Sequence, residues 1–153
     1  MTEPHDIDVA VRRAEMSDAA ALADLTTQLG YPTRTSEMEM RMEAIFADKN
    51  YATFVAVKGG KVCGMIGTFS LYSYEHNNPG GRILALVVAE NARRHGVGAA
   101  LIAAAENDFA ERNIRRIAVN TRLTRTEAHK FYEGLGYVRN GFRFVKEVPV
   151  SAD

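Results

Sequence analysis

The sequence lacks the features that would place the chain in an oxidising compartment or a membrane. It contains one cysteine, Cys63, so no disulfide can form within the chain. No apolar run approaches the roughly 18 residues that a membrane span needs, and no basic-then-apolar signal segment opens the sequence. We therefore expect a soluble cytoplasmic protein with no membrane partner.

Net charge is also absent, because 19 Lys and Arg residues balance 19 Asp and Glu residues. Without a basic field the chain is not expected to bind nucleic acid. The balance is not local, however. Residues 1–50 hold ten acidic and five basic side chains, whereas residues 91–130 hold eight basic and four acidic ones. The second segment is therefore the better place for an anionic ligand.

Two common nucleotide motifs and the usual metal motifs are missing. No Gly-Lys-Ser/Thr run forms a P-loop, and Leu101 stands where a dinucleotide fingerprint needs its third glycine. ATP and NAD are therefore disfavoured. We also expect no metal, because one cysteine cannot build the usual zinc site and the histidines are scattered along the chain, at His5, His76, His95 and His129.

What the sequence does contain is an alternation of strand and helix patterns. Helices are predicted to begin near residues 17–18, 36, 97 and 124; the Ser36/Glu39 and Thr124/Glu127 pairs have capping-box spacing. Strands are predicted near residue 7 and at 51–57, 62–72, 83–88 and 114–120, with a last hairpin at 137–139 and 142–148. The order βααβββαβαββ predicts an α/β fold with a mixed sheet, in one domain spanning residues 7–150.

The most informative segment joins the apolar run at 83–88 to the helix near residue 97. It is Arg93-Arg94-His95-Gly96-Val97-Gly98. Glycines at a helix start let a phosphate approach the backbone, where first-turn amides and the helix dipole bind it. The three potential cations favour an anion there. The alternative is that Gly96 and Gly98 only permit a tight strand-to-helix turn.

This turn resembles the acyl-CoA motif of the GNAT superfamily of N-acyltransferases, Arg/Gln-x-x-Gly-x-Gly/Ala after an apolar strand. A second motif of that superfamily, Ala-x-x-Phe-Tyr-x-x-x-Gly-Phe/Tyr, is matched about thirty residues later by Ala128-His129-Lys130-Phe131-Tyr132-Glu133-Gly134-Leu135-Gly136-Tyr137. The resemblance extends over nearly residues 7–148. It implies the GNAT fold, in which the central parallel strands, here 83–88 and 114–120, splay apart.

The resemblance also implies roles for individual residues. Backbone groups of Leu86, Val87 and Val88 would pair with the pantetheine arm of acetyl-CoA, and the Val88 N–H would donate to the thioester oxygen. Tyr132 would protonate the departing thiolate, since a phenol of pKa about 10 can share its proton with a thiol of pKa about 8.5. The remaining cofactor contacts would come from Arg93, Arg94, His95, Gly96, Val97, Gly98, Ala99 and Asn120.

Two positions depart from the family pattern. Arg125 stands where many members carry a cofactor-contacting asparagine; it could reach a CoA phosphate or face solvent. The strand 83–88 lacks the carboxylate that related proteins often use as general base. The alternatives for that role are a water chain or one of four side chains, Tyr72, Glu75, His76 and Glu90.

The expected function is an N-acetyltransferase that moves the acetyl group of acetyl-CoA directly to a primary amine of a small molecule or protein. The alternative is a non-catalytic acyl-CoA-binding module that senses the cofactor and acts through a protein partner. Glu37, Glu39 and Glu43 on the second helix would border the acceptor and favour a cationic amine, or else form a solvated face. The resemblance also makes a homodimer one expectation.

Overall fold

The computed structural model describes residues 8–120 and 126–149. Its contacts divide the chain into two compact units, Met1–Val119 and Asn120–Asp153. The first unit holds a sheet of five strands in the order β1-β2-β3-β4-β5. The strands are β1 (Val9–Arg13), β2 (Tyr51–Lys58), β3 (Lys61–Leu71), β4 (Gly80–Val88) and β5 (Ile117–Val119). The predicted start near residue 7 lies outside the described residues.

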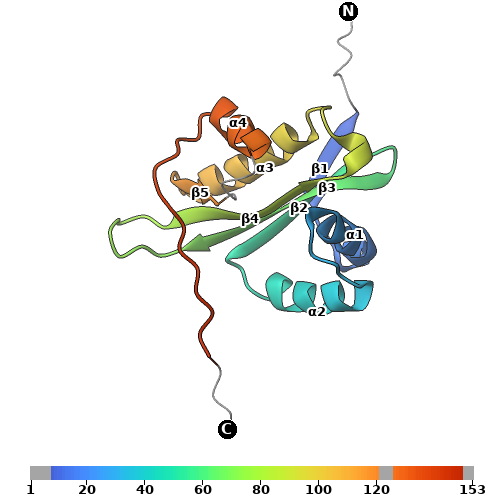
Figure 1. The fold of residues 1–153 in the computed structure, drawn as a ribbon, viewed down its shortest axis with the longest axis horizontal. Coiled ribbons are helices and arrows are strands. Elements are labelled where there is room, and N and C mark those ends of the chain that lie inside the picture. Colours follow the sequence, from blue (N-terminus) through green and yellow to red (C-terminus); the bar gives the residue numbers. More distant parts are fainter. Residues whose placement is uncertain (1–7, 121–125, 150–153) are drawn as a thin grey trace, which may run out of the picture. The chain divides into compact units, whose positions relative to one another are not determined.

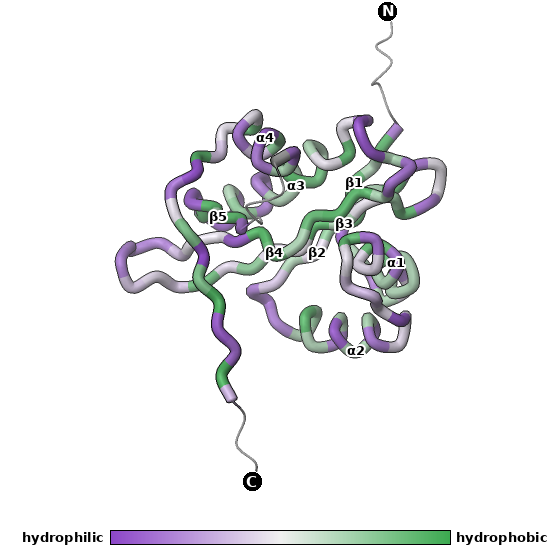
Figure 2. The backbone as a smooth tube through the Cα atoms, in the orientation of Figure 1, coloured by the Kyte–Doolittle hydropathy of each residue, from purple (hydrophilic) through white to green (hydrophobic). Residues whose placement is uncertain are grey.

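Helices cover both faces of this sheet (Figure 1). On one face, α1 (Ala19–Leu29) and α2 (Thr35–Phe46) pack on β2, β3 and β4, and Met42 joins a core with Val55, Met65 and Val87. On the other face lies α3 (Val97–Glu111). Figure 2 shows the hydrophobic residues along β3 and β4 and a hydrophilic loop between these strands.

Two glycines let α3 lie close to the sheet. A Cβ on Gly81 would lie 2.8 Å from the Phe109 ring. A Cβ on Gly64 would lie 3.0 Å from Leu101 and 3.1 Å from Val97. Gly64 and Gly81 therefore leave room for the side chains of α3, which pack against the backbone of β3 and β4.

The second unit contains α4 (Thr126–Gly134) and the segment that follows it. Gly136 at φ +94° ends the helix, and the Tyr137 N–H donates to the Tyr132 carbonyl at 3.0 Å, a left-handed C-cap of the kind that the glycine predicts. The Thr124 cap predicted for this helix lies outside the described residues.

The predicted hairpin of 137–139 and 142–148 is wrong, because residues 135–149 carry no strand. Asn140-Gly141 supplies a turn signal, but a two-stranded hairpin needs an apolar surface to cover its own apolar side chains. Here those side chains are 72–93% exposed: Val138, Phe142, Phe144, Val145 and Val148. The described structure therefore has nine of the predicted eleven elements.

Two further boundaries differ from the prediction. The α2 cap is Arg34, whose N–H donates to Glu37 at 2.9 Å, so the Ser36/Glu39 pair is not the capping box. The strand predicted at 114–120 shortens to Ile117–Val119. Its first residues instead complete the end of α3, where Asn113 takes φ +61° and the Ile114 N–H donates to the Phe109 carbonyl at 2.8 Å.

Candidate functional site

The central strands separate halfway along β4. Its parallel pairing with β5 runs from Gly81↔Ile117 to Ile83↔Val119 and then stops. Its antiparallel pairing with β3 continues to Gly64↔Val88. Residues 84–88 thus present one edge that no described strand covers, and we call this the free edge of β4.

The direction of the backbone groups at the free edge follows from two hydrogen bonds. The Ala89 N–H donates to the Cys63 carbonyl of β3 at 2.8 Å. Since neighbouring N–H groups of a strand point to opposite edges, the N–H groups of Val88 and Leu86 point away from β3. The Val88 carbonyl lies at the same edge and accepts a hydrogen bond from Arg93 Nε at 3.1 Å. The predicted oxyanion donor therefore faces the free edge.

The loop after β4 brings the predicted phosphate-binding residues into one turn. A short helix, η2 (Glu90–Ala92), leads to Arg94 at φ +67° and Gly96 at φ +81°, both in the left-handed region. Left-handed backbone is costly for a side chain such as that of Arg94 and is concentrated at functional sites. Arg93, Arg94 and His95 are all exposed around this turn.

The amides at the start of α3 have no helical acceptor. The first intrahelical bond joins the Ala100 N–H to the Gly96 carbonyl at 3.0 Å, so the N–H groups of Val97, Gly98 and Ala99 precede the hydrogen-bond ladder. Gly96 supplies no side-chain cap. Buried Val97 fixes this end of the helix in the core. These N–H donors, the dipole of α3 and the nearby cations together suit an anion such as a diphosphate.

Tyr132 lies on α4 in the second unit. It is buried, and its ring meets Phe131 at 5.2 Å and Tyr137 at 5.7 Å between centroids, both edge to face. Asn120 also belongs to the second unit and is exposed, while Arg125 lies outside the described residues. Their predicted contacts with a cofactor stay predictions.

The four candidate bases lie at different ends of β4. Tyr72, Glu75 and His76 belong to the exposed loop before β4, next to the Leu71↔Gly80 pair. At roughly 3.3 Å per residue, that end is about 26 Å from Val88 along the strand. Exposed Glu90 follows Val88 by two residues. Of the four, Glu90 therefore lies nearest in the chain to the free edge.

Ion pairs of Asp18 and Asp108 with arginines stabilise the first unit. Arg12 donates to both carboxylate oxygens of Asp18, at 2.8 and 3.0 Å, and this lowers the pKa of Asp18. Asp108 of α3 accepts from Arg13 of β1 at 3.0 Å and from Arg112 at 2.7 Å. The Arg13–Asp108 pair joins β1 to α3 across 95 residues, so no local sequence signal could have revealed it. Asp108 and Arg112, in contrast, have the i,i+4 spacing of an ion pair on one helix.

Cys63 lacks the features of a catalytic cysteine. Cys63 is buried, and desolvation raises the pKa of its thiol, so it is no activated nucleophile. Within residues 8–120 and 126–149, no three His, Cys, Asp or Glu side chains could together hold a metal ion. In the same residues no helix is long and apolar enough to cross a membrane.

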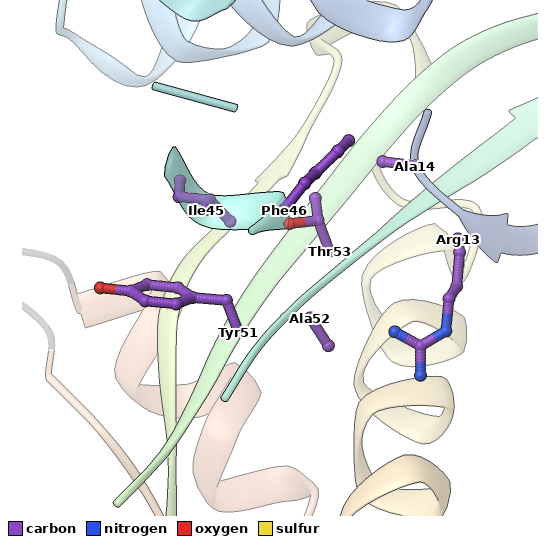
Figure 3. A pocket seen from close by; sticks show the side chains of 7 residues that line it. All are labelled: Arg13, Ala14, Ile45, Phe46, Tyr51, Ala52 and Thr53. Carbon is purple, nitrogen blue, oxygen red and sulfur yellow. The ribbon is translucent and has the colours of Figure 1, made fainter. Parts of the chain in front are cut away.

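A hollow of about 150 Å³ lies where α2 ends and β2 begins (Figure 3). Arg13 at its margin is already paired with Asp108, and the Tyr51 ring lies 4.6 Å from Phe69. Among the described residues, this hollow is therefore lined by no unpaired charged group that could act in catalysis. Its lining residues are Arg13, Ala14, Ile45, Phe46, Tyr51, Ala52 and Thr53.

Comparison with known proteins gives a consistent result. The model of the acetyltransferase (GNAT) family matches residues 19–137. The aminoalkylphosphonate N-acetyltransferase of Salmonella typhimurium is 33% identical over 99 residues, which are 65% of this chain and 64% of that protein. The chain thus spans about two thirds of the length of this relative.

Solved structures share the fold over nearly the whole chain. A GNAT family acetyltransferase from Staphylococcus aureus is similar with a TM-score of 0.79 at 28% identity, covering 92% of this chain and 98% of that one. AAC(6')-Iy, in complex with a bisubstrate analog, CoA-S-monomethyl-acetylneamine, gives a TM-score of 0.81 at 19% identity, covering 93% and 99%. At that identity the second likeness concerns the fold alone.

Proposed function

Since the chain belongs to the acetyltransferase (GNAT) family, we propose that it transfers the acetyl group of acetyl-CoA directly to a primary amine. One observation carries the proposal: the free edge of β4, with its outward-pointing amides, is followed by the turn at residues 93–98, whose cations and first-turn amides suit an anion and which we call the anion-binding turn. A long ligand with an acyl thioester at one end and phosphates at the other matches that order.

The residues present fit such a cosubstrate. Backbone groups of Leu86 and Val88 would bind an extended amide arm as an added strand would, and Val87 holds this segment in the core. The N–H groups of Val97, Gly98 and Ala99 would hold the diphosphate, with Arg93, Arg94 and His95 around it. Membership of the acetyltransferase (GNAT) family supports this cofactor class.

Acetyl-CoA supplies an activated acyl group, and the side chains and backbone would assist its transfer. The Val88 N–H would donate to the carbonyl oxygen as negative charge develops there. The Tyr132 hydroxyl would give its proton to the departing sulfur. Most of the rate would come from holding the amine and the thioester in one orientation. Glu90 or a water chain would take the proton from the amine.

The acceptor is proposed to be a small amine. The relative from Salmonella typhimurium is named for aminoalkylphosphonates, which carry an anionic group beside the amine. The acidic face of α2 favours a cationic acceptor instead, but Glu37 is occupied by its hydrogen bond to the Arg34 N–H, which leaves Glu39 and Glu43. A panel should therefore include aminoalkylphosphonates, aminoglycosides, polyamines and peptides with free amines.

The test is to mix the purified protein with acetyl-CoA and each amine of this panel and to follow the release of free thiol. We expect release that depends on both the protein and the amine, because transfer leaves CoA with a free thiol. Binding of CoA without thiol release across the panel would instead support the alternative, an acyl-CoA-binding module. Absence of CoA binding would contradict both functions.

A further inference from the structure

A side chain of α1 holds the beginning of the loop that follows β4. Gln28 Oε1 accepts a hydrogen bond from the Glu90 N–H at 3.0 Å, across 62 residues of sequence. Glu90 is the first residue of η2, and its amide lies three residues before Arg93. The contact therefore joins α1 to the segment whose backbone leads into the anion-binding turn.

Asp24 fixes the orientation of this glutamine. Gln28 Nε2 donates to Asp24 Oδ2 at 2.9 Å, one helical turn earlier on α1. An ionised carboxylate can only accept hydrogen bonds, so it selects the amide nitrogen and turns the amide oxygen toward Glu90. Two residues on one helix thus present a single acceptor to the loop.

The loop needs such support because its own conformation is costly. Arg94 adopts φ +67°, and the left-handed Gly96 follows two residues later. Inside the loop, Arg93 Nε holds the Val88 carbonyl and the Ala92 N–H donates to the Ala89 carbonyl at 2.9 Å. These bonds are local, whereas the Gln28 bond ties the loop to the rest of the unit.

We propose that Gln28, oriented by Asp24, is a positioning residue that holds the loop of residues 89–98 ready for acetyl-CoA. The inference rests on the proposed function. Gln28 touches no reacting atom in this scheme and acts through the Glu90 backbone. Its contribution is to order the loop before CoA binds. Bound CoA would hold the loop, and Glu90 with it, in place in either case, so Gln28 affects the affinity for CoA rather than the chemical step.

The test compares Gln28→Met with Asn107→Leu. Methionine keeps the length and helix propensity of glutamine but cannot accept the amide hydrogen bond well. Asn107 is an exposed amide on α3, so its replacement is a matched control. For Gln28→Met we expect a three- to tenfold rise in the Kd for CoA and in the KM for acetyl-CoA, kcat within about twofold of wild type, and faster hydrogen exchange of the Glu90 amide.

The outcomes separate this inference from the proposed function. If the wild type binds no CoA, both are overturned. If the wild type binds CoA and Gln28→Met binds equally well, or if Asn107→Leu weakens binding as much, only the positioning role is overturned. A fall in kcat with unchanged KM would overturn it too. Asp24→Asn should give a smaller rise in Kd than Gln28→Met, because asparagine no longer fixes which end of the amide faces Glu90.

Discussion

Tyr132 carries the proposed proton transfer to the leaving thiol, and its hydroxyl can be tested alone. Phenylalanine keeps the ring and therefore the edge-to-face contacts with Phe131 and Tyr137. For Tyr132→Phe we expect kcat at saturating acetyl-CoA to fall about 100-fold or more, because general acids contribute about 10²–10⁴-fold to catalysis. Steady-state rates across pH give the measurement. A kcat equal to that of wild type at every pH would remove the general-acid assignment.

Asp18 gives a pH-dependent contribution to stability. The Arg12 guanidinium and the Glu15 N–H lower its pKa below the ordinary value of 3.8. A lowered folded-state pKa means that this stability is fully present above the ordinary value and is lost as pH falls through the folded-state value.

We therefore expect Asp18→Asn to reduce the free energy of unfolding by about 1–3 kcal/mol near pH 7. The difference from wild type should shrink as pH falls below about 3.8. Urea unfolding at several pH values measures it. Exposed Asp8 supplies the control, since Asp8→Asn should change little. If the difference in free energy of unfolding between wild type and Asp18→Asn instead increased at lower pH, that result would contradict the stabilisation by this ion pair.

At the scale of elements, Gly81 decides how closely α3 can approach β4. A Cβ on Gly81 would meet three atoms of the Phe109 ring at 2.8–3.0 Å, whereas a Cβ on Gly67 would meet only the Met65 methyl at 3.9 Å. We expect Gly81→Ala to lower the free energy of unfolding by about 1–3 kcal/mol, as overpacking does. Gly67→Ala should be neutral or slightly stabilising, because alanine suits a strand better than glycine does. Denaturant unfolding of Gly81→Ala and Gly67→Ala measures the difference. Equal free energies of unfolding for these variants would contradict the close contact between Gly81 and Phe109.

The elements that the sequence predicts correctly have signals within a few residues. Gly30 ends α1 and Gly59-Gly60 joins β2 to β3, because each takes a positive φ that glycine adopts without cost. The hairpin after Tyr137 failed because its turn signal is local while the cover for its apolar residues is not. The strand-helix-strand order of residues 83–120 favours a parallel β4–β5 pair, which the structure has. Neither strand's own sequence indicates the residue at which the two strands separate.

The candidate site also contains features with a local sequence signal and features that depend on contacts between distant residues. The turn at residues 93–98 was predicted because glycines and cations recur within six positions. The Gln28–Glu90 bond was not, because 62 residues separate its partners. Family membership was confirmed, since two motifs of fixed spacing carry it; the roles of Val88, Tyr132 and the base remain predictions, because they depend on a bound cosubstrate.

At the scale of the whole molecule, zero net charge conceals a segment suited to an anion. Eight of the basic residues fall between residues 91 and 130, which include the turn at the start of α3. Binding of a polyanion there should stabilise the folded state, because a ligand that binds only the native chain adds RT ln(1 + [L]/Kd) to the free energy of unfolding. Thermal unfolding with and without CoA therefore reports on the site without any acceptor.

At a CoA concentration 100 times Kd the added free energy is about 2.7 kcal/mol. For a chain of this length each kcal/mol raises Tm by about 2–4 °C, so wild type should gain about 5–10 °C. Gly96→Asp should lose most of this gain, because a carboxylate would face the phosphates. Nothing lies within 4 Å of a Cβ at Gly96, and Asp and Asn both tolerate its positive φ better than most residues, so the fold should persist. Gly96→Asn is the neutral match and should keep a larger share of the shift; equal shifts for the two variants would place the phosphates elsewhere.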